Sequence, residues 1–359
     1  MSGVNKIDYV ELYVGNALQS ALYYQALWGF EIIGFKGLET GSRDIVSYLL
    51  VQNKVRLVLT TALSPDSPIA RHVTLHGDSV KNIAFEVADI HSFWNIAMKK
   101  GAKVAFEPNT HSDKNGNLST AGLKMYGDII HTFVERKHYQ GFFMPLFEEK
   151  YLGKSESTGI LAIDHITANV DRGKLDYWMD YYHNIFEFEE MLSFDENDIF
   201  TEHSAINTKV SANKNQKIKF PIIQPYNKTK KSQIQEFLDY NHGAGIQHLA
   251  LLTENIISTV SQLTERGIEF LSISENYYNS LENRLKELPI SISVLKSLDI
   301  MIDKENEGWI YQAFTKPLVD RPTFFIEIIE RKGAKSFGKG NVKGLMDSLE
   351  IIQQKRGNL

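Results

Sequence analysis

The stretch IDYVELYVGNALQSALYYQALWGFE at residues 7–31 has a counterpart later in the chain, IDHITANVDRGKLDYWMDYYHNIFE at residues 163–187. Each copy contains a short strand pattern of alternating apolar residues, a polar turn, a helix pattern rich in tyrosine and leucine, and an aromatic exit. A repeated stretch of this length indicates a repeated structural unit. The pair predicts that the two halves of the chain fold alike.

Two further stretches repeat in the same order. HGDSVKNIAFEVADIHSFWNIAMKKGAKV (76–104) matches HGAGIQHLALLTENIISTVSQLTERGIEF (242–270), and HTFVERK (131–137) matches FIEIIERK (325–332). In the longer pair, a turn with glycine leads into a strand, a helix and a second glycine that ends the helix. Each half therefore holds two strand–helix–strands units.

These repeats predict an α+β fold with two homologous domains and a helix at the C-terminal end. The expected domains are residues 1–150 and 158–359, the first without catalytic residues and the second with them. The joint between them is the polar stretch YLGKSEST at residues 151–158. Because this joint is short, we expect the domains to pack against each other.

The composition excludes several classes of function. The 359 residues include 43% hydrophobic and 23% charged side chains, with a net charge of −5 and no basic cluster that would indicate nucleic-acid binding. The absence of cysteine excludes disulfide frameworks, iron–sulfur clusters, thiolate zinc sites and a cysteine nucleophile, and it favours the reducing cytoplasm. The N-terminal residues lack the apolar segment of a signal peptide, and no apolar run approaches about 20 residues, so we expect no membrane partner.

Comparison of the aligned copies shows where the second half carries possible metal ligands. Three matched strand positions differ in the same sense: Tyr9 corresponds to His165, Asn82 to His248, and Thr132 to Glu327. Two imidazoles and one carboxylate on one sheet suit Fe(II) and leave positions open for substrate and O2, although zinc accepts the same ligands. A carboxylate within the apolar run TFFIEII would be costly without a partner. The sequence therefore predicts a metal site in the second half.

The other histidines are expected at the surface or in turns. They are His72, His76, His91, His111, His131, His138, His183, His203 and His242.

Several segments together resemble one enzyme family over nearly the whole length. They are VELYVGNA, GLETGSRD, IDHITANV, KSQIQEFLDYNHGAGIQHLAL, YQAFTKPLVDRPTFFIEIIERKGAKSFGKGN and the terminal helix. By these segments the chain is similar to the 4-hydroxyphenylpyruvate dioxygenase and 4-hydroxymandelate synthase family of the vicinal oxygen chelate superfamily. The resemblance implies paired βαβββ modules that form open barrels, with Fe(II) held by His165, His248 and Glu327 as the catalytic centre. It also implies an α-keto acid substrate, 4-hydroxyphenylpyruvate, which is oxidatively decarboxylated with O2.

The resemblance also implies the residues that bind the substrate. Glutamines hold the ring end, because an amide both donates and accepts hydrogen bonds and so suits a phenol hydroxyl. Phenylalanines form an aromatic wall, and the terminal helix turns one apolar face inward. These positions are Gln233, Gln247, Gln312, Phe314, Phe325, Phe337, Val342 and Leu345.

Three positions differ from the family members that form homogentisate. A pocket asparagine is here Ile223, a phenylalanine at the start of the last helix is here Val342, and a pocket serine is here Thr208. Hydroxymandelate synthases are similar to this chain at the first two positions. We therefore expect 4-hydroxymandelate as the product, with homogentisate as the alternative.

Other classes of function remain open from the sequence. One alternative is a metal-free binding protein, and another is a dioxygenase for a different α-keto acid, such as phenylpyruvate. We also expect a homo-oligomer, either a dimer or a tetramer.

Overall fold

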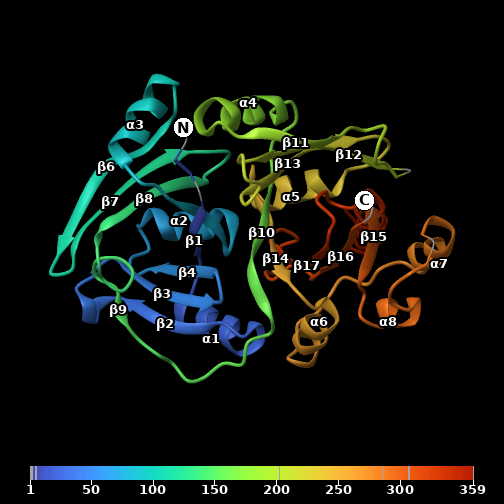
Figure 1. Cartoon of the computed structure of the whole chain (residues 1–359), viewed down its shortest axis with the longest axis horizontal. Coiled ribbons are helices and arrows are strands. Elements are labelled where there is room, and N and C mark those ends of the chain that lie inside the picture. Colours follow the sequence, from blue (N-terminus) through green and yellow to red (C-terminus); the bar gives the residue numbers. More distant parts are fainter. Residues whose placement is uncertain (1–2, 5, 202, 286, 306–307, 359) are drawn as a thin grey trace.

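Two curled β-sheets stand side by side, one from each half of the chain (Figure 1). The computed structural model describes residues 3–4, 6–201, 203–285, 287–305 and 308–358. In the view of Figure 1, the first half forms the left side in blue to green, and the second half forms the right side in green to red. The expected α+β class with two related half-barrel sheets is confirmed.

Each half contributes two βαβββ units. The strands of the first sheet are β1 (Lys6–Tyr13), β2 (Glu31–Lys36), β3 (Ile45–Gln52), β4 (Val55–Ala62), β5 (Ser79–Glu86), β6 (Val104–Asp113), β7 (Gly116–Lys124), β8 (Ile130–Tyr139) and β9 (Glu148–Glu149). The strands of the second sheet are β10 (Ile160–Asn169), β11 (Glu189–Phe194), β12 (Ser204–Ala212), β13 (Lys219–Asn227), β14 (Gly245–Thr253), β15 (Met301–Glu305), β16 (Gly308–Phe314) and β17 (Phe325–Lys332).

The strand order is the same in both halves. It runs β6-β7-β8-β5-β1-β4-β3-β2-β9 in the first sheet and, from the opposite edge, β11-β12-β13-β10-β14-β17-β16-β15 in the second. Apart from β9, each strand of one sheet has its counterpart at the equivalent place in the other. The first strands of the two units, β1 and β5 or β10 and β14, pair antiparallel at the centre of each sheet.

Helices connect the strands and cover the sheets. They are α1 (Ala17–Trp28), α2 (Pro68–His76), α3 (Ile90–Lys99), α4 (Leu175–Phe186), α5 (Gln233–Asn241), α6 (Ile256–Glu265), α7 (Glu275–Arg284), α8 (Ile292–Ser297) and α9 (Lys339–Lys355), with a short 3-10 turn at Leu38–Thr40. The short helices α7 and α8 lie between α6 and β15, where the first half has only a turn.

The matched helices α3 and α6 have the same kind of N-cap and are followed by the same kind of glycine turn. The side chain of Asp89 accepts a hydrogen bond from the Ser92 N–H, and Asn255 does the same for Ser258. Just after each helix stands a glycine with positive φ, 83° at Gly101 and 99° at Gly267. This left-handed backbone favours glycine, as the repeated sequence predicted.

Aromatic side chains pack the two halves together. Phe85 of β5 contacts Phe220 of β13 at 6.2 Å between ring centroids, and Phe93 of α3 stacks on Phe186 of α4 at 6.4 Å. The connection between the halves runs through residues 150–159 without helix or strand. Its Thr158 is buried and donates a hydrogen bond to the Trp28 carbonyl. The halves are thus in firm contact, as expected, while the boundaries at residues 150 and 158 stay a prediction.

The expectation for the nine other histidines was wrong at three positions. His72, His76 and His131 are buried. His131 lies between the halves, where its Nε2 is 2.7 Å from the Tyr182 hydroxyl. Burial lowers the pKa of His131 to about 3, so this ring is neutral at ordinary pH. The contacts of His76 and His131 with the second half were not visible in the sequence of either copy alone.

Candidate metal centre

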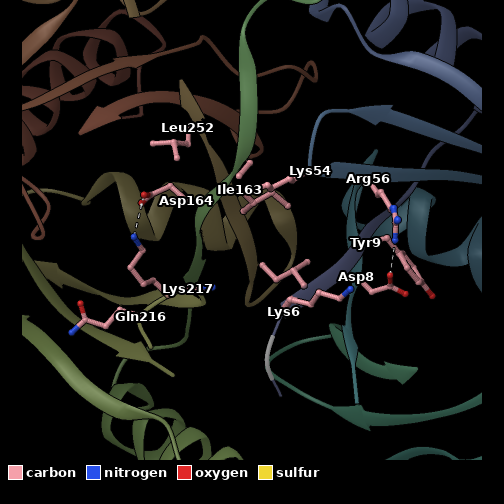
Figure 2. Close-up of a pocket in the computed structure, with 13 residues that line it drawn as sticks. Lys6, Asp8, Tyr9, Lys54, Arg56, Ile163, Asp164, Gln216, Lys217 and Leu252 are labelled. Carbon is pink, nitrogen blue, oxygen red and sulfur yellow. Dashed lines mark hydrogen bonds and ion pairs between the residues drawn. The ribbon is translucent and has the colours of Figure 1, made fainter. Parts of the chain in front are cut away.

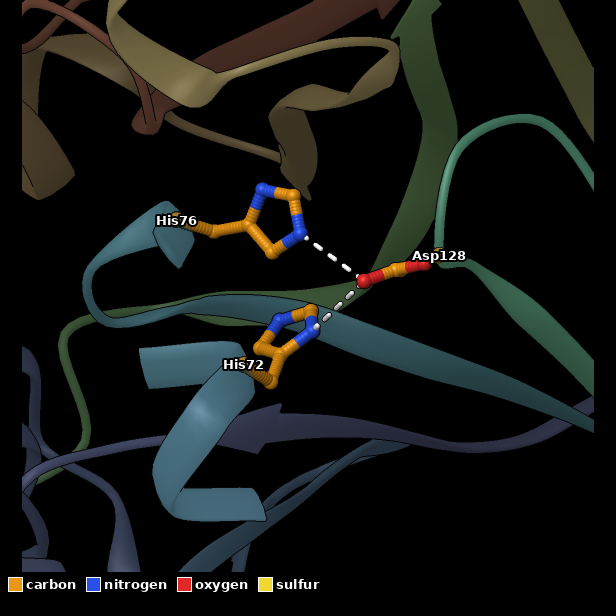
Figure 3. Close-up of side chains that lie close together, drawn as sticks. All are labelled: His72, His76 and Asp128. Atoms are coloured by element: carbon orange, nitrogen blue, oxygen red, sulfur yellow. Dashed lines mark hydrogen bonds and ion pairs between the residues drawn. The ribbon is translucent and has the colours of Figure 1, made fainter. Parts of the chain in front are cut away.

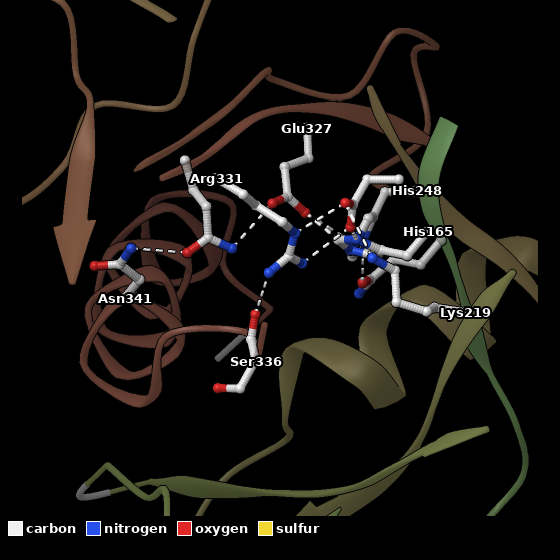
Figure 4. A network of polar contacts seen from close by, with 10 residues as sticks. His165, Lys219, His248, Glu327, Arg331, Ser336 and Asn341 are labelled. Carbon is white, nitrogen blue, oxygen red and sulfur yellow. Dashed lines mark hydrogen bonds and ion pairs between the residues drawn. The ribbon is translucent and has the colours of Figure 1, made fainter. Parts of the chain in front are cut away.

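Three possible metal ligands converge on neighbouring strands of the second sheet. The Nε2 atoms of His165 on β10 and His248 on β14 lie 3.2 Å and 3.4 Å from the same carboxylate oxygen of Glu327 on β17. All three side chains are buried, with exposed fractions of 2%, 6% and 1% respectively. Figure 4 shows the Glu327 carboxylate joined to His165 and His248 within a network of polar contacts.

The strand register confirms the correspondence between the two copies. Tyr9 of β1 and Thr132 of β8 pair with one and the same residue of β5. In the second sheet, His165 of β10 and Glu327 of β17 both pair with Ala250 of β14. The ligand candidates therefore occupy the positions that hold tyrosine and threonine in the first half.

The hydrogen bonds of the Nδ1 atoms fix the tautomer of each neutral ring. His165 Nδ1 donates to the Asp164 carboxylate at 2.8 Å, and His248 Nδ1 donates to the Gln247 carbonyl oxygen at 3.0 Å. In the neutral rings that a metal ion requires, both Nε2 atoms would then carry the lone pairs, and these face Glu327. For metal–ligand bonds of about 2.1 Å, neighbouring ligands lie about 3.0–3.4 Å apart, which matches the observed spacing. The three acceptors thus fit a divalent ion placed between them.

A buried ionic network supports His165 from behind. The Asp164 carboxylate accepts hydrogen bonds from Arg331 at 2.8 Å and 2.9 Å and from Lys219 at 3.1 Å. Burial raises the pKa of Asp164, but His165 and Arg331 outweigh burial and hold that pKa well below its usual range. Asp164 is therefore ionised, which orients the His165 ring and strengthens it as a ligand.

The first half contains the same network without a ligand. Asp8 accepts hydrogen bonds from Arg136 at 2.6 Å and 2.9 Å and from Arg56 at 2.9 Å. The next residue is Tyr9 where the second half has a histidine. The aspartate–arginine pairing is thus common to both halves. In the second half it lies next to the ligand candidates His165, His248 and Glu327.

A second chain of hydrogen bonds holds Glu327. Its Oε1 accepts from the Gln312 amide at 2.9 Å, and the Gln312 carbonyl oxygen accepts from Asn341 on α9 at 2.7 Å. Burial raises the pKa of Glu327, but without a metal the positive charge of His165 and hydrogen bonds from the His165 and His248 rings outweigh burial and lower that pKa to about 2; a bound metal ion would take the place of those protons. The carboxylate is therefore ionised and fixed in orientation, as a ligand must be.

The ligand candidates open into a largely apolar pocket under α9. The space between the lining side chains is about 600 Å³, including the part open to solvent. Most of the expected substrate-binding residues line this pocket: Thr208, Ile223, Gln233, Gln247, Gln312, Phe314, Phe337, Val342 and Leu345. Phe325 does not line the pocket but stacks behind His248, with 4.8 Å between ring centroids.

Several other lining residues were missed by the sequence analysis. Thr167 lies two residues after His165 on β10, so the two-residue period of a strand could have placed it on the same face. Its hydroxyl is buried with no hydrogen-bond partner among the described residues. The same period places Ile206 and Val210 on the face of Thr208, and Pro221 on the face of Ile223, whereas Phe194 carried no such signal.

A larger cavity of about 1090 Å³ lies between the two halves (Figure 2). Its lining includes Lys6, Lys54 and Lys217 together with the aspartates of both ionic networks. None of the three converging ligands lines it. We therefore place the chemistry in the smaller apolar pocket, which contains all three.

Paired βαβββ units with a two-histidine, one-carboxylate set define a protein of the vicinal oxygen chelate class. The model of the Glyoxalase/Bleomycin resistance protein/Dioxygenase superfamily matches residues 6–118 and 162–282. A 4-hydroxyphenylpyruvate dioxygenase from Yarrowia lipolytica is 41% identical over 98% of this chain and 93% of its own length. One from Tetrahymena thermophila is 42% identical over 98% of this chain and 91% of its own length.

A solved structure gives the same result. A triple mutant of 4-hydroxymandelate synthase from Streptomyces coelicolor superposes with a TM-score of 0.87, at 30% identity, covering 98% of this chain and 99% of the other. The chain therefore belongs to the 4-hydroxyphenylpyruvate dioxygenase and 4-hydroxymandelate synthase family within that superfamily. It is a non-haem, metal-dependent dioxygenase. In the described part of the chain, no helix has the length and apolar character needed to cross a membrane.

Proposed function

We propose that this enzyme oxidatively decarboxylates 4-hydroxyphenylpyruvate with O2 at an Fe(II) ion held by His165, His248 and Glu327. The observation that carries this proposal is the convergence of three buried acceptor atoms within 4.8 Å of one another. When bound, the Fe(II) ion supplies a Lewis acid for the α-keto acid and electrons for O2. The names of the relatives support both the substrate and the reaction.

The pocket side chains would orient the substrate. Phe314, Phe337 and Leu345 form apolar walls that would hold the aryl ring and exclude water. The glutamine amides would bind the ring hydroxyl, and a pocket built for that hydroxyl discriminates against phenylpyruvate. Of these glutamines, Gln247 and Gln312 also form hydrogen bonds with the ligand candidates, whereas within the described residues Gln233 bonds to Gln247 and to none of the ligands.

We propose 4-hydroxymandelate as the main product, because Ile223 and Val342 both line the pocket. Ile223 lies on β13 directly opposite Thr208 of β12, and Val342 lies in the first turn of α9. Two aliphatic side chains at these places would leave the aryl ring room to turn and no amide to hold it. The benzylic carbon would then take the place of the ring carbon as the point of oxygen insertion. A shift of about 1 Å suffices to redirect such a step.

Homogentisate is the second candidate product. It is favoured by relatives named 4-hydroxyphenylpyruvate dioxygenase that are 41% and 42% identical over 98% of the chain. Both reactions consume one keto acid and one O2 and release one CO2. Because the two products are isomers, mass alone does not separate them.

Chromatography of the product from the iron-loaded enzyme tests the proposal. We expect mainly 4-hydroxymandelate from the natural chain, and a shift toward homogentisate in the double variant Ile223→Asn with Val342→Phe. Because these residues line one cavity, their effects should be non-additive. Homogentisate as the almost exclusive product of the natural chain would refute the 4-hydroxymandelate assignment and support the second candidate.

The iron content of a ligand variant tests the metal site. His248→Ala should lower iron content and abolish turnover, while the fold survives, because Asn82 occupies the matched position in the first half. An active, iron-replete His248→Ala enzyme would rule out this site, and a natural chain that binds the keto acid without iron or turnover would be a binding protein. The cytoplasmic location and the dimer or tetramer remain predictions, which cell fractionation and light scattering of the purified protein test.

A further inference from the structure

A second cluster of metal-type ligands lies in the first half, at the end of α2 (Figure 3). His72 and His76 are four residues apart on this helix and so share one face. Asp128 reaches them from the turn before β8. Its Oδ2 lies 3.0 Å from His76 Nε2 and 3.9 Å from His72 Nδ1. In Figure 3 both rings point toward this carboxylate.

A backbone carbonyl fixes the tautomer of the neutral His76 ring. His76 Nδ1 forms a hydrogen bond with the carbonyl oxygen of Asn241, the last residue of α5. A carbonyl only accepts, so Nδ1 carries the hydrogen and a neutral His76 has its lone pair on Nε2. That lone pair faces the carboxylate of Asp128, which also only accepts when ionised. Two acceptors 3.0 Å apart need a proton or a metal ion between them.

The same reasoning fixes the ring of His72. Its Nε2 lies 3.0 Å from the Ser79 hydroxyl, and that hydroxyl donates its hydrogen to the Gly77 carbonyl at 3.2 Å. Ser79 therefore accepts from Nε2–H, and the lone pair of His72 is on Nδ1. This buried Nδ1 has no hydrogen-bond partner among the described residues. Burial lowers the pKa of His72 to about 3, so the ring stays neutral and available as a ligand.

We propose that His72, His76 and Asp128 bind a second divalent transition-metal ion, of the zinc or cobalt type. For bonds of about 2.1 Å in a tetrahedral site, ligand atoms lie about 3.4 Å apart, and the two measured distances bracket this value. The Ser79 hydroxyl and the Asn241 carbonyl then act as outer partners that orient the two rings. The Asp128 side chain is 53% exposed, which gives an ion access from solvent and leaves a position for water.

A protonated His76 is the competing arrangement, because an imidazolium would pair with Asp128 without a metal. It leaves His72 Nδ1 unsatisfied, since that atom is 3.9 Å from the carboxylate and carries no hydrogen. Lys81 does not fill the site either, because its ammonium donates to the backbone carbonyl of Asp128. A metal ion satisfies all three acceptors at once.

The position of the cluster indicates what the ion would do. His76 connects α2 of the first half to the end of α5 in the second half, and α5 begins at Gln233 in the substrate pocket. A bound ion would fix α2 against α5 and stabilise the contact between the halves. The proposed role is structural, and it is independent of the reaction at the buried centre.

Cobalt titration of the full chain, stripped of metal, tests the proposal. Glu327→Ala removes a ligand of the buried centre, so we expect this variant still to bind one Co²⁺ with visible ligand-field absorption. Adding His72→Ala to it should abolish that binding, and adding Asp128→Asn should weaken it at least tenfold. The matched control is His111→Ala, an exposed histidine on β6, which should leave the cobalt stoichiometry unchanged.

Thermal unfolding provides a second measurement. Zn²⁺ should raise the melting temperature of the Glu327→Ala protein and should not raise that of the protein with His72→Ala in addition. His72→Ala alone should keep its iron content and turnover, which shows that the chain has folded. The proposal fails if the Glu327→Ala protein binds no Co²⁺, or if it binds Co²⁺ equally well with and without His72; the imidazolium pair is then the correct description.

Discussion

Asp164→Asn should weaken metal binding and destabilise the fold, and the repeat supplies a control that separates the two effects. The Asp164 carboxylate accepts from His165, from Arg331 twice, and from Lys219. An asparagine offers one acceptor oxygen and turns its NH₂ group toward donors. Removal of such an outer-shell carboxylate typically lowers metal affinity about 10–100-fold. The buried cations left behind cost roughly 3 kcal/mol of unfolding free energy.

Asp8→Asn is the matched control, because Asp8 holds Arg136 and Arg56 in the same way with Tyr9 beside it. It should destabilise the chain less than Asp164→Asn does, since Arg56 is 44% exposed and loses less on becoming unpaired. It should leave iron affinity unchanged. The assays are chelator competition for iron and urea unfolding of the metal-free proteins. The reasoning would be refuted if Asp164→Asn bound iron as tightly as the natural chain. It would also be refuted if Asp164→Asn and Asp8→Asn lost the same amount of iron affinity.

Three further changes test other parts of the structure. Gln233→Leu should reduce kcat/KM for 4-hydroxyphenylpyruvate more than for phenylpyruvate at unchanged iron content, and equal losses would show that Gln233 does not bind the hydroxyl. His131 has a pKa lowered to about 3 in the fold, against about 6.5 unfolded, so the unfolded chain takes up a proton first and stability falls as pH drops between these values, by about 1.4 kcal/mol per unit. His131→Phe should flatten this slope in urea unfolding between pH 6.5 and 4.5, and an unchanged slope would contradict the assignment. Arg321 donates to the carbonyls of Thr74 and Leu75 in the first half and Tyr240 in the second, so Arg321→Ala should lower the free energy of unfolding by about 1 kcal/mol, with iron content as the control.

The repeat made the fold and the converging side chains predictable from sequence. Matched strands carry matched positions, so His165, His248 and Glu327 could be found as departures from Tyr9, Asn82 and Thr132. The register of both sheets confirms this correspondence. The two-residue period of a strand also predicts that Thr167 lies beside the ligands, on the same face of β10 as His165.

The remaining features depend on contacts between distant segments, which no local pattern encodes. His76 and His131 contact residues of the second half, whereas His72 packs against Tyr13 and Ser79 of its own half. The bond of Gln312 to Glu327 depends on the pairing of β16 with β17. Phe325 was expected in the pocket wall; it shares a face of β17 with Glu327, but its ring is stacked on the His248 ring and does not line the pocket.

The two halves differ in whether the interior of the sheet is filled. In the first half, Tyr9 packs edge-on against Phe143 at 5.4 Å, and Phe143 contacts Phe147 in turn. Glu11, at the position of Thr167, is partly buried and accepts a hydrogen bond from the Thr60 hydroxyl. These side chains fill the interior of the first sheet. Histidines introduced at the matched positions there would therefore lie on a similar sheet, but no space for a substrate would remain beside them. The second half keeps its interior open beneath α9, so the same framework serves packing in one half and chemistry in the other.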